Sequence, residues 1–171
     1  PPPPPPPPPI DDIALITAGE IQVRGANVFK TYWRLPEITA ESFTADGWFK
    51  TGDMAERDTD GSYRILGRLS QDIIKSGGYK ISALEIASAL LAHPDFREAA
   101  VVGLPDEKWG ERVAVAFVPR PGREIDEKVG AEFLRGRLAH YKVPTLWLGV
   151  ESLPRNTMGK VLKAQVRTLF A

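Results

Sequence analysis

Several features are missing from this sequence, and each absence removes a class of protein. There are no cysteines, which excludes a disulfide framework and a thiolate metal site. Lys plus Arg and Asp plus Glu both number 22, so no general attraction to nucleic acid or to an anionic membrane is expected. The longest apolar runs, such as Val113–Val118, are far too short to span a bilayer. His93 and His140 lack metal-ligating companions at useful spacing, so no metal site is predicted.

One composition feature is present in excess, namely the unbroken proline run Pro1–Pro9. Proline lacks an N–H and fixes φ, so this run is expected to form a polyproline II rod without a core. It is either a tag, linker or truncation scar, or a ligand for aromatic-lined grooves of proline-binding domains. We favour the first interpretation because the run has no flanking specificity residues. The abrupt junction with Ile10 suggests that the native chain continued upstream.

The remaining sequence predicts an α+β fold. Before Arg68 we expect a strand at 20–24, a short helix at 36–43 and a hairpin, with strands at 53–57 and 62–66. After Arg68 we expect strands and three helices. These strands are placed at 72–75, 79–81, 99–103, 112–118 (buried on one side) and 145–150, and the helices at 82–93, 126–140 and 161–170.

The expected elements form two pieces behind the proline segment 1–9. Residues 10–68 contain strands and only one short helix, which is too little to bury a full core alone. Residues 69–171 are enough for a module that folds by itself. Its first helix begins with a capping box, in which Ser82 caps the helix and Glu85 reaches back to the Ser82 N–H.

Two charged residues near the boundary are candidates for ligand binding. Asp53 follows the tight turn Thr51-Gly52 and begins a strand, where its carboxylate can accept two hydrogen bonds from a vicinal diol such as that of ribose. The alternative is that Asp53 only caps its own turn. Arg68 follows a glycine, and its guanidinium can bind ribose oxygens or phosphate. The alternative is a surface salt bridge.

Three further positions suit a phosphate-bearing ligand. Gly77 and Gly78 allow a ligand to approach the backbone closely, although a plain hairpin turn also explains them. Lys75 adds positive charge beside them, or is simply solvated. Lys160 ends a polar loop, 154–160, just before the last helix, where its ammonium suits developing negative charge on a phosphorus or carbonyl oxygen. The alternative is a solvent-facing lysine. The loop is no P-loop, because the spacing of that motif is absent.

Taken in order, these motifs resemble the AMP-forming acyl-CoA synthetase, luciferase and adenylation-domain superfamily. The resemblance covers essentially everything after the proline run. The matching segments are 19–25 (GEIQVRG), 48–53 (WFKTGD), 67–68 (GR), 72–85 (DIIKSGGYKISALE), 138–144 (LAHYKVP) and 154–160 (PRNTMGK). Within the superfamily, 76–81 and 154–160 look most like the malonyl- and methylmalonyl-CoA synthetase branch. Other acyl-CoA synthetases, of medium-chain fatty acid or coumarate type, are the alternative.

The resemblance implies a two-step reaction and a role for each candidate residue. A carboxylate attacks the α-phosphate of ATP, giving an acyl-adenylate, and the thiol of coenzyme A then displaces AMP. Asp53 and Arg68 would hold the adenylate ribose, and Lys160 would bridge phosphate and carboxylate oxygens. Gly77 and Gly78 would lie along the pantetheine path with Lys75 nearby. Ser70 stands at the hinge position, where the family commonly has Asp or Lys.

The resemblance also implies what lies outside this sequence. Residues 10–68 would be the end of a large ATP-binding domain and residues 69–171 a mobile C-terminal lid domain. The phosphate loop, the Mg²⁺ ligand and the acyl pocket would precede Gly19, so the chain is expected to be inactive alone. The partners implied are a small carboxylate, ATP and CoA, in the cytoplasm or the mitochondrial matrix. A detached binding module with a proline-rich arm is the competing hypothesis.

Overall fold

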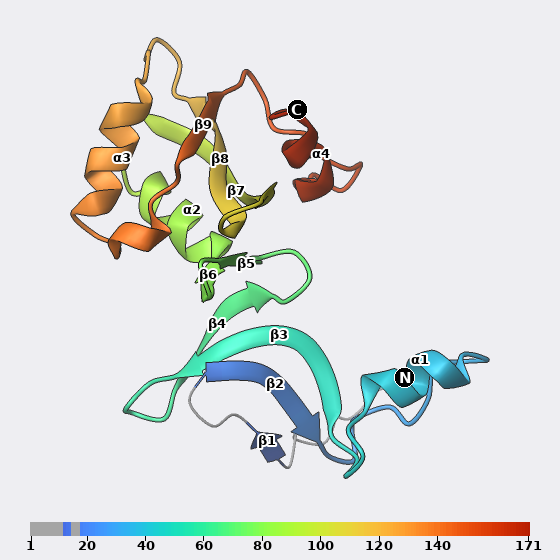
Figure 1. The fold of residues 1–171 in the computed structure, drawn as a ribbon. Coiled ribbons are helices and arrows are strands. Elements are labelled where there is room, and N and C mark those ends of the chain that lie inside the picture. Colours follow the sequence, from blue (N-terminus) through green and yellow to red (C-terminus); the bar gives the residue numbers. More distant parts are fainter. Residues whose placement is uncertain (1–11, 15–17) are drawn as a thin grey trace, which may run out of the picture. The chain divides into compact units, whose positions relative to one another are not determined.

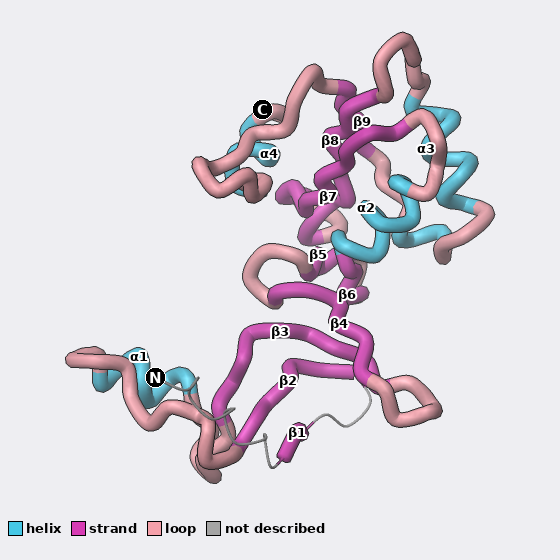
Figure 2. Tube along the Cα trace, turned by 180° about the vertical axis from the view of Figure 1, so that it is seen from behind, coloured by secondary structure: helices cyan, strands magenta, loops and turns pink. Residues whose placement is uncertain are grey.

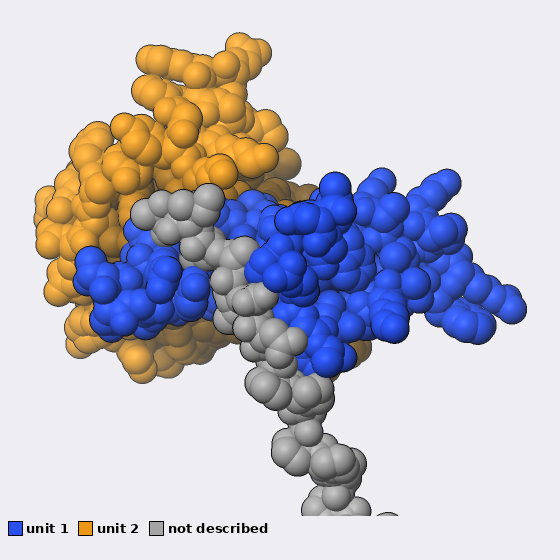
Figure 3. Space-filling model, turned by 90° about the horizontal axis from the view of Figure 1, so that it is seen from below, with its two compact units in different colours: residues 1–69 blue, residues 70–171 orange. Residues whose placement is uncertain are grey.

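The chain divides into two compact units, residues 1–69 and 70–171 (Figure 3). The structure, a computed structural model, describes residues 12–14 and 18–171, and the proline run Pro1–Pro9 lies outside the described residues. The division falls one residue after the boundary expected from the sequence. Strands and helices are both present, so the α+β class is confirmed. No helix in the described part of the chain is long and apolar enough to cross a membrane.

The first unit is an antiparallel four-stranded sheet in the order β1-β2-β3-β4, with one short helix (Figure 1). The elements are β1 (Asp12–Ala14), β2 (Ala18–Arg24), α1 (Pro36–Ser42), β3 (Phe49–Arg57) and β4 (Tyr63–Arg68). The predicted β3–β4 hairpin is confirmed, and its turn is closed by a hydrogen bond from the Asp58 N–H to the Ser62 carbonyl (2.8 Å). The expectation that the strand begins at Asp53 is wrong. It begins at Phe49, because Thr51 and Gly52 lie within β3 at a register irregularity and do not form a turn before it.

The first unit buries few of its apolar side chains. Over residues 19–69, the buried hydrophobic residues are Met54 and Ala55, both on β3. Phe29 and Tyr32 meet edge-on with a ring-centroid separation of 4.7 Å, yet they are 40% and 39% exposed. Apolar burial is the main favourable term in folding. This unit therefore has little to stabilise it by itself.

The second unit is built on a five-stranded sheet in the order β6-β5-β8-β7, with β9 parallel to β8. Its strands are β5 (Ile73–Ser76), β6 (Tyr79–Ser82), β7 (Phe96–Asp106), β8 (Gly110–Pro119) and β9 (Leu146–Gly149). Its helices are α2 (Ala83–Leu91), α3 (Glu127–Arg135), the 3₁₀ turn η1 (His140–Lys142) and α4 (Lys163–Thr168). Helices α2 and α3 lie on one side of β7 and β8, and α4 lies on the other (Figures 1 and 2).

The central strand β8 is buried on both faces, so the expectation of burial on one side is wrong. Val113, Val115 and Phe117 pack with α2 and α3, whereas Ala114 and Ala116 pack with α4. A strand covered on both faces is apolar at every position. The uninterrupted apolar run in the sequence was the signal for this arrangement.

The three helices predicted for the second unit are confirmed, with shorter bounds. Ser82 caps α2, because its hydroxyl accepts from the Glu85 N–H (3.1 Å). The Glu85 carboxylate accepts from Lys142 Nζ (2.7 and 2.9 Å), so it ties α2 to η1. Helix α3 ends at Arg135 rather than near His140, because Gly136 serves as its C-cap. Helix α4 likewise ends before Phe170.

Candidate functional site

Asp53 lies beside an irregularity in the first sheet. Glu20 pairs with Met54 and Gln22 pairs with Lys50, so residues 51–53 of β3 face only Ile21 of β2. Such a bulge bends the strand and re-aims the side chains next to it. Gly52 occupies the bend with φ of +76°, a conformation that glycine adopts without a steric penalty.

Two side chains fix the bulge to β2. The Glu20 carboxylate accepts a hydrogen bond from the Gly52 N–H (2.9 Å), and the Thr51 hydroxyl donates to the Ile21 carbonyl (2.8 Å). The Asp53 N–H in turn donates to the Thr51 hydroxyl (3.1 Å). Glu20 carries no local sequence signal of this role, since its contact with Gly52 spans 32 residues. The hydrogen bonds of Thr51 and Gly52 hold the bulge against β2, and the bond from the Asp53 N–H to Thr51 fixes the backbone at Asp53.

Asp53 and Arg68 are brought together across the sheet. They are register partners of β3 and β4, and Arg68 Nε lies 2.9 Å from Asp53 Oδ1. Both line a pocket of about 630 Å³ together with Glu20, Tyr32 and Thr51. The Arg68 side chain is 59% exposed and that of Asp53 is 34% exposed. An ion pair this exposed contributes little to stability, about 0–1 kcal/mol.

Gly77 and Gly78 form the two-residue turn between β5 and β6. Both have positive φ, +56° and +84°, and the flanking residues Ser76 and Tyr79 are register partners. Positive φ at both central positions defines the type I′ turn that suits a tight hairpin. The Gly77 N–H also donates to the Trp109 carbonyl (2.9 Å). A Cβ at Gly77 would lie 3.0 Å from the Trp109 ring, so this position is confined by a neighbour as well as by its backbone.

Gly77 borders a pocket of about 440 Å³, which we call the aromatic pocket. Tyr79, Trp109 and Tyr141 line it, and the two tyrosine rings stack with centroids 4.2 Å apart. Lys108 lies over the Trp109 ring at 4.9 Å and adds positive charge to the rim. No sequence motif links these aromatic residues, because they come from three separate segments.

Gly78 and Lys75 are placed differently from Gly77. Neither lines the aromatic pocket. Gly78 has open space around its Cβ position. The Lys75 side chain is exposed, while its backbone N–H donates to the Glu111 carboxylate (2.6 Å). Of Gly77, Gly78 and Lys75, the structure therefore places Gly77 at the aromatic pocket and the other two away from it.

Lys160 lies on an ordered turn that precedes α4. The Asn156 side-chain oxygen accepts from the Lys160 N–H (2.9 Å), and the Asn156 N–H donates to the Lys160 carbonyl (2.9 Å). The Lys160 side chain is exposed. Across residues 18–171, no polar partner is found for its ammonium. Lys160 is thus a solvent-accessible cation on a well-defined backbone.

Ser70 is the first residue of the second unit and is exposed. It connects the end of β4 to the segment that leads into β5. A connection of this kind is where φ and ψ changes can be absorbed if two units move against each other. Its place in the chain is compatible with the predicted hinge.

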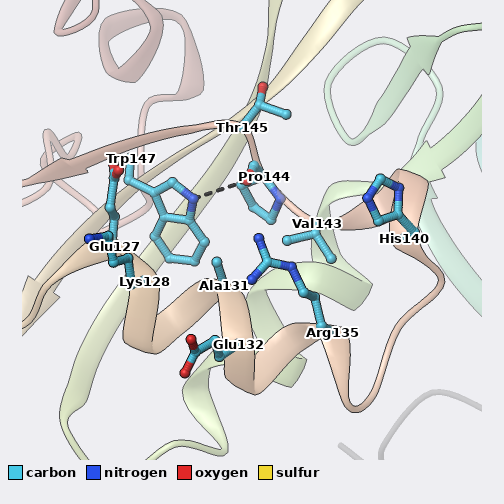
Figure 4. Close-up of a pocket in the computed structure, with 10 residues that line it drawn as sticks. All are labelled: Glu127, Lys128, Ala131, Glu132, Arg135, His140, Val143, Pro144, Thr145 and Trp147. Atoms are coloured by element: carbon cyan, nitrogen blue, oxygen red, sulfur yellow. Dashed lines mark hydrogen bonds between the residues drawn. The ribbon is translucent and has the colours of Figure 1, made fainter.

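Another pocket, of about 510 Å³, lies beside α3 and contains none of the predicted site residues (Figure 4). The Trp147 indole N–H donates to the Pro144 carbonyl (3.0 Å), so the Nε1 edge of the ring faces this segment. The neighbouring helix position Gly130 is filled by the same ring, since a Cβ there would lie 2.5 Å from it. Residues 12–14 and 18–171 contain no group of three His, Cys, Asp or Glu able to hold a metal ion.

Comparison with known proteins gives the geometry a context. The family described as AMP-binding enzyme C-terminal domain matches residues 85–160. The mitochondrial malonate–CoA ligase ACSF3 of Bos taurus is 52% identical over 89% of this chain and 26% of the relative. The malonate–CoA ligase of Arabidopsis thaliana is 51% identical over 87% of this chain and 26% of its own. The crystal structure of ATP-bound MatB from Rhodopseudomonas palustris superposes with a TM-score of 0.79 at 41% identity, over 95% of this chain and 31% of that one.

Residues 85–160 match the AMP-binding enzyme C-terminal domain family, and most of the chain is similar to part of malonate–CoA ligases and of MatB, which are AMP-forming acyl-CoA synthetases. The resemblance stated from the six motifs is therefore confirmed. The family match runs from Glu85, within α2, to Lys160, and therefore lies within the second unit. The chain spans about a quarter of the length of the curated relatives that it matches, 26% for the two named above. Of the candidate residues, Asp53 and Arg68 form a pair, Gly77 borders the aromatic pocket and Lys160 lies on its own turn.

Proposed function

We propose that this chain is the C-terminal portion of an ATP-dependent, AMP-forming carboxylate–CoA ligase. In the first step, a carboxylate oxygen attacks the α-phosphorus of ATP and pyrophosphate leaves. In the second step, the thiol of CoA attacks the acyl carbonyl and AMP leaves. The proposal is carried by Lys160, which lies exposed on an ordered turn without a polar partner in the described part of the chain.

Lys160 acts in the adenylation step under this proposal. Negative charge develops on the oxygens around the α-phosphorus as pyrophosphate leaves, and an ammonium held beside them stabilises that charge. A lysine already engaged in an ion pair would first have to give up its partner. The Lys160 side chain has no such partner to lose, so its charge is available to the substrate.

Asp53 and Arg68 bind the ribose of the adenylate in the same scheme. A carboxylate accepts hydrogen bonds, and the guanidinium donates them, so the adjacent pair offers both functions to a vicinal diol. The carboxylate and the guanidinium are 2.9 Å apart and line the same pocket, so one ligand can contact both. Because the pair is exposed and contributes little to stability, a ligand hydroxyl can replace part of it at small cost.

The aromatic pocket serves the thioester step. Gly77 lets the Trp109 ring pack against the turn at the edge of the pocket, and the stacked tyrosines provide apolar surface. The pantetheine arm of CoA is a narrow chain that needs such a passage, and its nucleotide end carries phosphates that suit Lys108. Ser70 is proposed as the hinge that lets the second unit present Lys160 in one step and Gly77 in the other.

Malonate or methylmalonate is the proposed carboxylate. The support is the identity of about half to relatives named malonate–CoA ligase and the likeness to MatB. Mg²⁺ is proposed to accompany ATP with ligands outside residues 18–171, so no step is derived through it. Of the two compartments expected, the mitochondrial one is supported by the name of the Bos taurus relative.

The test separates the two half-reactions. Residues 18–171 would replace the matching region of Rhodopseudomonas palustris MatB, and malonate-dependent ATP–pyrophosphate exchange would be measured in the hybrid enzyme. Lys160→Ala is expected to lower this exchange by at least about 100-fold, the size of effect seen when one preorganised group is lost. Thioester formation from supplied malonyl-adenylate and CoA should be unchanged.

Two matched variants complete the design. Lys128→Ala removes a lysine of α3 that lines the pocket of Figure 4 and lies outside the Asp53–Arg68 pair, the aromatic pocket and the Lys160 turn, and it should leave both half-reactions unchanged. Gly77→Val should slow thioester formation and spare pyrophosphate exchange. Equal losses in both half-reactions for Lys160→Ala would refute the assignment of Lys160. The 171-residue chain alone is expected to show no exchange.

A further inference from the structure

The peptide unit that carries Lys160 is bound by a single side chain and its backbone. The Asn156 side-chain oxygen accepts from two N–H groups, those of Met158 (3.0 Å) and Lys160 (2.9 Å). The Asn156 N–H donates to the Lys160 carbonyl (2.9 Å), and the Gly159 N–H donates to the Asn156 carbonyl (2.9 Å). Both backbone polar groups of Lys160 are therefore held by Asn156.

The turn that carries Lys160 is anchored to strand β7 of the sheet through Arg155. The Arg155 guanidinium donates to the Gly159 carbonyl (2.5 Å) and pairs with the Glu98 carboxylate of β7. Arg155 and Val161 form an isolated antiparallel bridge that closes the base of the turn. β7 pairs with β8 along most of its length. The salt bridge to Glu98 therefore connects the turn to the most buried part of the unit.

We propose that Asn156 is a positioning residue for Lys160, supported through Arg155 by Glu98. The inference rests on the proposed function, in which Lys160 acts in adenylation. A lysine side chain is a mobile point charge with several rotatable bonds. Fixing its backbone reduces the number of positions that the ammonium must search, and misplacement by about 1 Å can cost about 100-fold in rate.

Asparagine fits this role for a specific reason. Two N–H groups converge on one oxygen, so the residue must supply an acceptor and not a donor at that point. Aspartate keeps that acceptor, whereas alanine removes it, so the Met158 and Lys160 N–H groups would donate to water instead. The series Asn156→Ala and Asn156→Asp therefore separates loss of the acceptor from change of the side chain as such.

The first measurement needs no activity. Amide hydrogen exchange would be recorded by NMR on the 171-residue chain and its variants. In Asn156→Ala, the Met158 and Lys160 amides should exchange about tenfold faster, since two neutral hydrogen bonds are lost. Asn156→Asp should exchange like the parent. Asp126→Ala is the control, because the Asp126 side chain accepts from the Lys128 N–H (2.9 Å) at the start of α3, and it should leave Lys160 exchange unchanged.

The second measurement uses the hybrid enzyme described above. Asn156→Ala should lower kcat for pyrophosphate exchange at least about tenfold with KM for ATP and malonate unchanged, and should spare thioester formation. Asn156→Asp should restore most of kcat. Unchanged exchange of the Lys160 amide, or equal losses in both half-reactions, would overturn the proposal. If instead Lys160→Ala itself leaves adenylation intact, it is the proposed function that fails, while the amide-exchange result still reports on the turn.

Discussion

Alanine at Gly77 would strain the β5–β6 turn and press on Trp109, whereas alanine at Gly78 would only strain the turn. Both glycines have positive φ, +56° and +84°, which costs an L-residue about 1–2 kcal/mol. At Gly77 the new Cβ would also lie 3.0 and 3.3 Å from two atoms of the Trp109 ring. Overpacking of this kind costs about 1–3 kcal/mol. We therefore expect about 1–2 kcal/mol for Gly78→Ala and about 2–5 kcal/mol for Gly77→Ala.

The assay is urea unfolding of the 171-residue chain, monitored by residue-resolved NMR in the second unit. The indole N–H resonance of Trp109 provides a second readout, and it should shift in Gly77→Ala and not in Gly78→Ala. Gly122→Ala is the control, because Gly122 has φ of +76° in the loop after β8 and nothing within 4 Å of its Cβ position. Equal costs for Gly77→Ala and Gly78→Ala, with an unmoved Trp109 resonance, would refute the argument that Gly77 is required by its neighbour.

Three further predictions concern the rest of the chain. Gly130→Ala should destabilise the second unit by about 1–2 kcal/mol, because the clash with Trp147 outweighs the helix propensity gained. Gly136→Ala, at an ordinary αR position, should stabilise it by about 0.5 kcal/mol. Calorimetry measures the sign of each change, and a stabilising Gly130→Ala would contradict the packing of Trp147 against Gly130. Lys163→Met should cost about 2–4 kcal/mol, since it leaves Asp72 (14% exposed) without the ammonium that lies 2.5 Å away, and Asp72→Asn with Lys163→Met should recover part of the loss in denaturant titrations. Hydrogen bonds from the Ser62 backbone N–H and hydroxyl lower the pKa of Asp60. The β3–β4 turn should therefore be stable at pH values above the ordinary aspartate pKa and weaken as the pH falls through the lowered pKa of Asp60. An NMR titration of the Asp60 carboxyl with an ordinary midpoint would contradict this.

Local features of the fold could be predicted because the physics that fixes them is local. Ser82 caps α2 through a hydrogen bond to a residue three positions away, and the turn 58–61 closes between neighbours in the chain. Helix ends were less predictable. The apolar pattern continues past Arg135, but the chain leaves the helix at Gly136 and turns into η1, where Lys142 pairs with Glu85 of α2. That partner is 57 residues away, so no local pattern reports it.

By itself, the sequence determined the α+β class, the order of the motifs and the superfamily, since each rests on short segments whose residue types and spacing can be read directly. The tertiary structure alone decided which of those residues meet. Register across β3 and β4 places Arg68 beside Asp53, and the end of the β7–β8 hairpin places Trp109 against Gly77. Strand register and sheet order set such contacts, and both depend on the packing of the whole unit. The structure also separated Lys160, held by Asn156 on its own turn, from Lys75, whose charge points to solvent.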